Sequence, residues 1–401
     1  MAVLEVKNLY KIFGKTPEKA KELSKQNVPK DEILKKTKNT VGVNDVSFSV
    51  EEGETFVVMG LSGSGKSTLI RCLNRLHKPT FGEVVLEGEN LVDLNAEALR
   101  HVRRKKMSMV FQNFGLLPHR TVMGNVEYGL EIQGVPVEER QKKAKDALKL
   151  VGLEGYESMK PDALSGGMQQ RVGLARALVN DPDILLMDEA FSALDPLIKK
   201  NMQDELLKLQ EKMRKTIVFI THDLDEALKL GDRIAVMYEG KIVQIGTPEE
   251  ILTNPANDYV RDFVENVNRA RVITAESIML PPLAVVEDKD GPKAAIRKME
   301  KESISSIFVV NKQRVLQGVV TIDRAVELAN ANKRSLKDAI ETVEHEVSPD
   351  TLIADMLEMA TSAKYPIAVV DDKRKLLGVV VRVAVIAGIK GIKNGEVNDH
   401  A

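Results

Sequence analysis

This 401-residue sequence has one cysteine, almost no net charge and no long apolar run, and each of these features argues against a class of protein. The single cysteine, Cys72, has no partner for an intramolecular disulfide, which favours a reducing compartment. The 58 basic and 59 acidic residues nearly cancel, whereas a general nucleic-acid binder is usually basic. We therefore expect no nucleic-acid partner.

No apolar run reaches the length of about 18 residues that a membrane-spanning helix needs. The best candidate, residues 378–389, is short and contains Arg382. The start, MAVLEVKNLY, alternates apolar and polar residues and lacks the apolar core of a signal peptide. We expect a chain that neither spans a membrane nor is exported, while attachment to a membrane through a partner stays open.

The length predicts two or three domains. Residues 1–265 mix β-like runs such as TFVVMG and KTIVFIT with helical patterns, which is typical of an α/β domain. A lysine-rich insertion at 15–40 is either a solvated helical excursion or a contact with a partner or with membrane headgroups. Residues 266–273 are expected to form a linker.

An internal repeat fills the remainder of the chain. SSIFVVNKQRVLQGVV is echoed by KYPIAVVDDKRKLLGVV, with Val310 and Gly318 matched by Val370 and Gly378 at an offset of 60 positions. A repeat used only twice predicts a pseudo-symmetric pair rather than a solenoid. We expect repeats at 274–331 and 332–393, followed by a tail at 394–401.

The segment GLSGSGKS, between strand-like TFVVM and helix-like TLIRCLNRL, has the P-loop pattern in its strand–loop–helix context. Gly63 and Gly65 let backbone N–H groups converge on phosphate oxygens. Lys66 adds a positive charge at the β- and γ-phosphates, and Ser67 offers a hydroxyl to Mg²⁺. The expected ATP-binding residues are Gly60, Leu61, Ser62, Gly63, Ser64, Gly65, Lys66, Ser67 and Thr68.

Four further polar residues follow strand-like runs and are expected at the same sheet edge. DILLMDEA ends in two carboxylates, of which Asp188 suits the Mg²⁺ shell and Glu189 suits the base that activates water. Gln112 follows MSMVF and His222 follows TIVFIT, and both can hydrogen-bond a γ-phosphate or its water without adding charge. Such residues alone are usually structural, but their shared edge favours catalytic roles, with Gln112 also a candidate metal ligand.

Together, GLSGSGKS, VFQNF, LSGGMQQR, LLMDEA, SALD and ITHD resemble an ABC-type ATPase in identity and order, over roughly residues 3–265. The resemblance implies an α/β fold with a RecA-like core, a helical subdomain at about 113–164 and a small antiparallel sheet. It also implies that Phe13 stacks on the adenine of ATP.

The stretch LSGGMQQR, residues 164–171, resembles the signature motif of that family, which faces ATP bound by a second subunit. Backbone N–H groups at the start of the following helix are suited to an anion. One P-loop per chain then implies a head-to-tail dimer that encloses two ATP molecules. The residues implied on this side are Ser165, Gly166, Gly167, Gln169 and Asp195.

Several longer segments, among them VFQNFGLLPHRTV and NPANDYVRDFVENV, are similar to the ATPase of glycine betaine/proline importers. This resemblance implies uptake of an osmoprotectant on the cytoplasmic face of a prokaryotic membrane. It also implies transmembrane permease subunits and an extracytoplasmic substrate-binding protein or domain. The alternative is a soluble ABC ATPase acting on nucleic acid or ribosomes, although such proteins usually carry two cassettes or a long coiled-coil insertion.

The two C-terminal repeats resemble CBS motifs, which form an α/β CBS-pair module and often hold adenine nucleotides with a threonine and an aspartate. Here Thr321 is present, Asp323 follows at two positions rather than three, and Val381 replaces the second hydroxyl. Two interpretations stay open: a dimerising spacer without ligand, or a regulator that responds to ionic strength or a cyclic dinucleotide. The basic turn at 373–375 either meets anionic lipid or phosphate, or is solvated.

Overall fold

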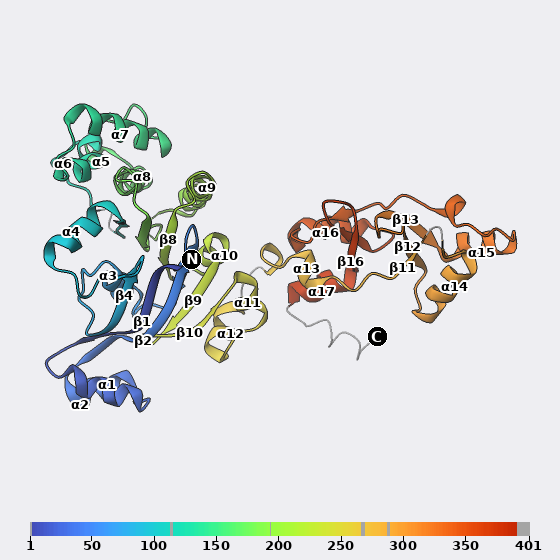
Figure 1. Cartoon of the computed structure of the whole chain (residues 1–401), viewed down its shortest axis with the longest axis horizontal. Coiled ribbons are helices and arrows are strands. Elements are labelled where there is room, and N and C mark those ends of the chain that lie inside the picture. The colour runs from blue at the N-terminus through green and yellow to red at the C-terminus, as the bar shows by residue number, and fades with distance from the viewer. Residues whose placement is uncertain (1, 113–114, 193, 266–268, 287–288, 391–401) are drawn as a thin grey trace. The chain divides into compact units, whose positions relative to one another are not determined.

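The computed structural model describes residues 2–112, 115–192, 194–265, 269–286 and 289–390 (Figure 1). The chain divides into two compact units, one up to Glu265 and one from Asn266 onward. The expected tail at 394–401 and part of the expected linker, 266–268, lie outside the described residues. Within the described ranges, no helix has the length and apolar character to cross a bilayer.

A six-stranded sheet forms the centre of the first unit, in the order β10-β9-β3-β8-β7-β6. All neighbours from β9 to β6 pair in parallel, and β10 is antiparallel at one edge. Every residue of β3, β7 and β8 is buried, as expected for parallel strands covered on both faces. The strands are β3 (Thr55–Met59), β6 (Met107–Val110), β7 (Ile184–Asp188), β8 (Thr216–Thr221), β9 (Arg233–Tyr238) and β10 (Lys241–Gly246).

Helices follow most of these strands in the chain. They are α3 (Lys66–Leu73), α4 (Ala96–Lys105), α9 (Pro196–Met213), α10 (Leu224–Leu230), α11 (Pro248–Thr253) and α12 (Asp258–Val264). Five of these six helices begin at a polar residue whose side chain accepts a backbone hydrogen bond, and α3 begins at a glycine instead. Thr247 and Glu250, for example, form a reciprocal capping box at the start of α11.

A second, antiparallel sheet has the order β2-β1-β4-β5. Its strands are β1 (Ala2–Phe13), β2 (Thr40–Glu51), β4 (Phe81–Leu86) and β5 (Glu89–Asn90). Phe48 of β2 stacks on Phe56 of β3, with ring centroids 4.8 Å apart. One hydrophobic core, which includes Leu4, Val84 and Ile184, therefore joins the two sheets.

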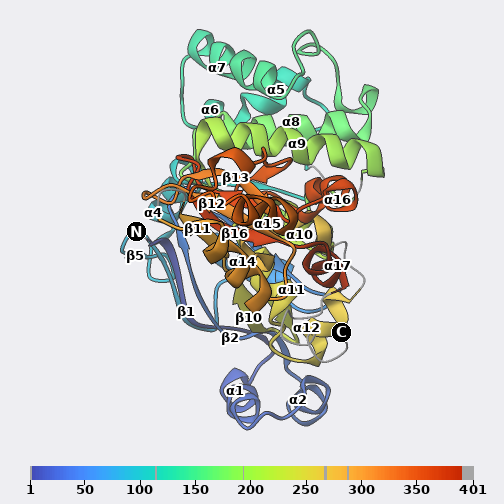
Figure 2. The ribbon, with the colours of Figure 1, turned by 90° about the vertical axis from the view of Figure 1, so that its right-hand side faces the viewer.

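The lysine-rich insertion forms two helices, α1 (Pro17–Lys25) and α2 (Lys30–Thr37), between β1 and β2. Figures 1 and 2 show both helices at the end of these strands. The insertion leaves the β1–β2 pairing after Phe13 and returns to it at Thr40, which faces Phe13 in the register. The pairing of β1 with β2 therefore continues up to the two residues between which the insertion lies.

A buried asparagine closes the base of the insertion. Asn39 is fully buried, its amide nitrogen donates to the carbonyl of Thr16 at 3.1 Å, and its amide oxygen accepts from Thr16 N at 3.2 Å. Gly14 lies beside it at φ +140, where a Cβ would stand 1.9 Å from the Asn39 oxygen. Only glycine fits that position.

The helical subdomain lies between β6 and β7. It contains α5 (Val122–Val126), α6 (Tyr128–Ile132), α7 (Val137–Leu150), the 3-10 turn Pro161–Ala163 and α8 (Gly166–Leu178). Asn125 is fully buried, donating to the carbonyl of Leu117 at 3.0 Å and accepting from its N–H at 2.7 Å. This pair anchors the loop that follows β6 to α5.

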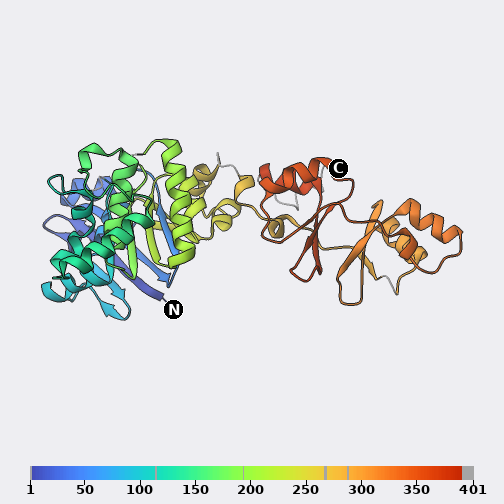
Figure 3. The same cartoon turned by 90° about the horizontal axis from the view of Figure 1, so that it is seen from above.

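The second unit contains two three-stranded sheets of the same topology, β11-β12-β13 and β14-β15-β16. In each, the first pair is parallel and the second antiparallel. The register pair Val309–Gly318 of the first sheet has its counterpart in Val369–Gly378 of the second. The repeat offset of 60 positions is thus reproduced in three dimensions (Figure 3, first repeat orange, second red).

The elements of this unit are α13 (Ala275–Ile278), β11 (Ala284–Val286), α14 (Pro292–Lys301), β12 (Ser306–Val310), β13 (Leu316–Thr321), α15 (Ile322–Asn330), β14 (Glu346–Val347), α16 (Ile353–Ser362), β15 (Ile367–Val370), β16 (Leu376–Val380) and α17 (Arg382–Lys390). The two repeats exchange backbone hydrogen bonds symmetrically. Leu316 N donates to Arg374 O at 2.9 Å, and Leu376 N donates to Arg314 O at 3.0 Å. A shared cluster including Phe308 and Ala368 packs the repeats into one module.

Candidate active site

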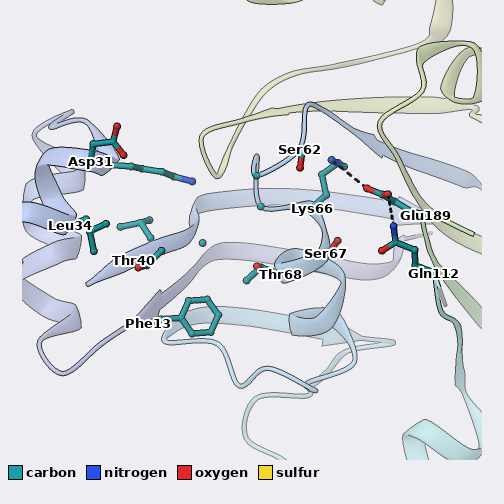
Figure 4. A pocket seen from close by; sticks show the side chains of 15 residues that line it. Phe13, Asp31, Leu34, Thr40, Ser62, Lys66, Ser67, Thr68, Gln112 and Glu189 are labelled. Carbon is teal, nitrogen blue, oxygen red and sulfur yellow. Dashed lines mark hydrogen bonds and ion pairs between the residues drawn. The ribbon is translucent and has the colours of Figure 1, made fainter. Parts of the chain in front are cut away.

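A cavity of about 510 Å³ opens where the carboxyl ends of β3, β6 and β7 meet the end of the β1–β2 pair (Figure 4). Its volume lies within the usual range for small-ligand sites. Nine residues expected from the sequence line it: Phe13, Ser62, Gly63, Gly65, Lys66, Ser67, Thr68, Gln112 and Glu189. Three lining residues that the sequence did not suggest come from α2, namely Lys30, Asp31 and Leu34.

The loop between β3 and α3 is held tightly against neighbouring backbone. Gly65 caps α3 at φ +108, and a Cβ there would stand 2.2 Å from the carbonyl oxygen of Gly42. The carbonyl of Ser64 accepts from Gly240 N at 2.7 Å. The first turn of α3 therefore faces the cavity with N–H groups that the helix itself does not use, as an anion site requires.

Lys66 is a buried cation with only 4% of its surface exposed. Its ammonium donates to the carbonyls of Gly60 at 2.7 Å and Leu61 at 3.1 Å, and lies 3.9 Å from a carboxylate oxygen of Glu189. Burial lowers the pKa of Lys66, with Glu189 and then Asp188 opposing that shift. An anion in the cavity would supply the charge compensation that this side chain lacks.

Asp188, at the end of β7, is almost fully buried. Burial raises its pKa, while a hydrogen bond from Ser67 and the guanidinium of Arg71, 3.6 Å away, act in the opposite direction. Its Oδ1 atom has no hydrogen-bond partner among the described residues. A buried carboxylate oxygen without a partner is costly unless a ligand satisfies it.

The pair Asp188 and Ser67 fits Mg²⁺, which usually takes one or two protein oxygens and completes its shell with phosphate and water. Over the described part of the chain, no group of three or more His, Cys, Asp or Glu side chains is arranged to hold a metal alone. The donor set therefore fits a metal ion that shares its shell with a phosphate ligand.

Glu189 lies where several strand ends converge. Its Oε2 accepts from Gln112 Nε2 at 3.1 Å and lies 3.3 Å from His222 Nδ1, and the Gln112 amide is also 3.5 Å from Ser192 Oγ. Glu189 has φ +46, a left-handed conformation that costs a non-glycine residue about 1–3 kcal/mol. Its N–H donates to Ile220 O at 3.0 Å, which helps to hold the strained backbone in place.

Phe13 lies at the opposite end of the cavity from Glu189 in Figure 4. Its ring is 40% exposed and meets the ring of His77 edge-on, with centroids 5.7 Å apart. The ammonium of Lys11 lies 4.8 Å from the ring centroid. Phe13 therefore presents aromatic surface to the cavity instead of packing into the core.

None of the described residues that line the cavity belongs to the segment 164–171 or to α9. Ser165 caps α8 by accepting from Met168 N at 3.4 Å, and Asp195 caps α9 by accepting from Leu197 and Ile198. A Cβ on Gly167 would stand 2.5 Å from Ile198, so α8 and α9 pack closely there. The predicted set Ser165, Gly166, Gly167, Gln169 and Asp195 thus lies at the starts of two helices, outside the pocket of its own chain.

The remaining predicted residues lie near the cavity without lining it. Gly60 and Leu61 hold Lys66 through their carbonyls, and Ser64 is a buried residue of the loop itself. Asp188 and His222 contact the lining residues Ser67 and Glu189. The structure therefore brings both groups of predicted residues, those after the strands and those of the loop, to one place.

Comparisons with known proteins agree with this geometry. The sequence matches the ABC transporter family over residues 43–192 and the CBS domain family over residues 275–330. It is 54% identical to a glycine betaine/carnitine transport ATP-binding protein of Listeria monocytogenes, over 100% of both chains. It is 55% identical to a glycine betaine transport ATP-binding protein of Bacillus subtilis, over 97% of this chain and 92% of that one.

Among solved structures, a dimeric ATP-binding cassette in a post-hydrolysis state with ADP and Pi aligns with a TM-score of 0.52 at 35% identity. That alignment covers 61% of this chain and 98% of the other. The expected ABC cassette fold is confirmed by this likeness, and the expected CBS module by the family match and the repeated sheets. This chain belongs to the ABC transporter ATPases, in the family of glycine betaine transport ATP-binding proteins.

Proposed function

We propose that this chain hydrolyses ATP to power the uptake of glycine betaine or a related quaternary amine or proline-type osmoprotectant. Its full-length similarity to glycine betaine transport ATP-binding proteins supports this substrate class. The observation that carries the ATPase mechanism is the convergence of Lys66, Gln112 and Glu189 on one cavity beside a buried carboxylate. The chain would act on the cytoplasmic face of the membrane, attached to transmembrane permease subunits.

In this mechanism the loop Gly60–Thr68 binds the triphosphate through its N–H groups, and Lys66 neutralises the β- and γ-phosphates. Ser67, Gln112 and Asp188 would hold Mg²⁺, which when bound reduces the negative charge of the phosphates. Glu189 accepts the proton of the attacking water, since its carboxylate lies at the phosphate end of the cavity. Gln112 holds that carboxylate by a hydrogen bond, and His222 lies beside it with Nδ1 at 3.3 Å.

Two copies would complete each site. Ser165, Gly166, Gly167, Gln169 and Asp195 lie outside the pocket of their own chain, so they are free to contact ATP bound by a second copy. N–H groups at the start of α8 and a neutral serine suit a γ-phosphate. A related cassette solved as a dimer with ADP and Pi supports this arrangement.

The CBS module would regulate transport, responding to ionic strength, a cyclic dinucleotide or anionic lipid. Thr321 accepts from Arg324 N at 3.4 Å as the cap of α15, so its hydroxyl already serves the helix. In the basic turn, Arg374 is paired with Glu346 at 3.0 Å, while Lys373 and Lys375 are exposed. These exposed cations are the candidates for an anionic ligand.

An extracytoplasmic substrate-binding protein or domain would deliver the substrate to the permease.

Glu189→Gln tests the ATPase mechanism. Removing the base should lower ATP turnover at least about 100-fold while ATP binding is retained, because general base catalysis typically contributes that much. Glu211→Gln, on an exposed position of α9, is the matched control and should turn over ATP normally. Wild-type turnover by the Glu189 variant would remove that residue from the mechanism.

The transport assignment is tested separately in vesicles that contain the chain and its permease. Uptake of labelled glycine betaine should require ATP inside and should change with internal salt. ATP hydrolysis without uptake of any quaternary amine would overturn the substrate class but not the ATPase.

A further inference from the structure

We infer that helix α2 of the insertion forms one wall of the ATP-binding pocket and that Leu34 covers the face of the adenine that Phe13 leaves open. The inference rests on the proposed binding of ATP, which it deepens by assigning a second base-binding residue. It gives a ligand-contacting role to a segment that the ATPase motifs do not include.

The cavity has two chemically different ends. Lys66, Ser67, Gln112 and Glu189 lie together at one end, where phosphate chemistry belongs (Figure 4). Figure 4 shows Asp31 and Leu34 of α2 at the opposite end, with Phe13 below them. These two ends therefore correspond to the triphosphate and to the base of a bound nucleotide.

The surface of α2 within the pocket matches a base rather than a phosphate. Leu34 is 43% exposed, so it offers apolar surface that nothing in the described protein covers fully. Asp31 is exposed in the first turn of α2, and its negative charge would repel phosphate at this end. A purine between an aromatic ring and a leucine side chain would bury apolar surface on both of its faces.

Leu34 is held in place by a rigid support. The preceding residue, Ile33, is 1% exposed and packs in a cluster with Tyr10, Ile12 and Val41. The same helix ends at Thr37, and its C-cap Lys38 donates its N–H to the carbonyl of Leu34 at 2.8 Å. An exposed leucine on an anchored helix is preorganised to bind, because little backbone entropy remains to be lost.

Lys30 connects the base end to the phosphate loop. It lines the same cavity, and its ammonium lies 3.0 Å from the place that a Cβ on Gly240 would occupy. Gly240 in turn donates to the carbonyl of Ser64 in the loop. The insertion therefore contacts both the base end of the pocket and the turn that supports the phosphate loop.

The absence of tryptophan from the chain allows a direct test. Leu34→Trp introduces the sole indole, which would stack on adenine, whereas Lys35→Trp places the same probe at the next position, exposed and outside the pocket. In the full chain, Mg-ATP should change the fluorescence emission of the Leu34 variant, and inorganic tripolyphosphate should not. Mg-ATP should leave the emission of the Lys35 variant unchanged. Equal responses of both variants to ATP would overturn the inference.

A second measurement uses affinity. Leu34→Gln should weaken ATP binding about threefold to tenfold, as expected for the loss of part of one leucine contact, and leave tripolyphosphate binding unchanged. Leu34→Met should restore ATP affinity, and Lys35→Gln should not alter it. Unchanged ATP binding by Leu34→Gln would refute the role of α2, whereas failure of the wild-type chain to bind ATP would instead refute the proposed function.

Discussion

At the residue scale, buried charged groups mark the atoms that await a ligand. Lys66 and the free oxygen of Asp188 are charged groups held in the protein at a cost that a phosphate and a cation would relieve. These buried charges lower the stability of the ligand-free fold and are suited to binding. Cys72 provides a contrasting case on the same helix, since its thiol is buried in the core and has no part in the mechanism.

Cys72 should be inert in the folded chain and reactive once the chain unfolds. It is 1% exposed, and burial raises its pKa from 9.0 to about 12, so both access and thiolate formation are suppressed. Since the folded pKa is the higher one, the stability contributed by the neutral thiol is lost as pH rises from 9.0 towards 12. The rate of labelling with a thiol reagent near neutral pH, with and without urea, measures the reactivity of Cys72 in the unfolded and folded chain. Rapid labelling without urea would contradict it.

The site illustrates what a sequence can predict at this scale. The loop Gly60–Ser67 and the acidic pair at the end of β7 could be recognised from their residue types and order alone, and the structure brings Lys66 and Glu189 to within 3.9 Å. The left-handed backbone of Glu189 could not be predicted, because it depends on a hydrogen bond to β8 on a distant segment. The three pocket residues of α2 were missed because a lysine-rich helix is usually solvated.

At the scale of elements, the insertion packs through few apolar residues and is also held by polar side chains, among them the buried hydroxyl of Ser24, which donates to Asn44 Oδ1 at 2.6 Å. Ala20 and Ile33 are its buried apolar residues, and Leu23 and Val28 are partly buried beside them, which is too little apolar periodicity to distinguish a docked helix from a solvated one. Asn39 joins the two ends of the insertion through Thr16. Such a closure is encoded by pairs of residues far apart in the chain and leaves no local pattern.

Asn39→Ala should loosen the insertion without unfolding the sheet. It removes the closure and leaves the N–H of Thr16 without its acceptor, a cost of roughly 1–3 kcal/mol. Tryptic cleavage at lysines of α1 and α2 should become faster, and amide exchange should rise over residues 17–37. Gln26→Ala, at the exposed end of α1, is the control and should leave both rates unchanged. An unaltered cleavage rate for the Asn39 variant would mean that the closure is not needed.

At the scale of the whole molecule, the chain contains separate cores. The core that joins the two sheets of the first unit shares no residue with the clusters of the CBS module. The repeat of the second unit could be predicted because an offset of 60 positions is a direct sequence signal. The exchange of hydrogen bonds between the turns at Arg314 and Arg374 could not, since it joins backbone groups without regard to side-chain identity.

Separate cores predict two unfolding transitions in calorimetry of the full chain. Mg-ATP should raise the midpoint temperature of only one of them. A ligand stabilises the unit that binds it, and 100-fold saturation corresponds to about 2.7 kcal/mol. The rise should be absent in Lys66→Ala, which loses the phosphate contact but keeps both transitions. A single transition, or an equal rise of both, would show that the units unfold together.

The pairing of Phe13 with Thr40 has a practical consequence. Because the insertion leaves and rejoins a hairpin at facing positions, its ends lie about 5 Å apart, a gap that a two-residue turn spans. We therefore expect that an Asn-Gly turn can replace residues 14–39 with the hairpin kept, and that the shortened chain loses the adenine contact assigned to Leu34 while the phosphate loop stays in place.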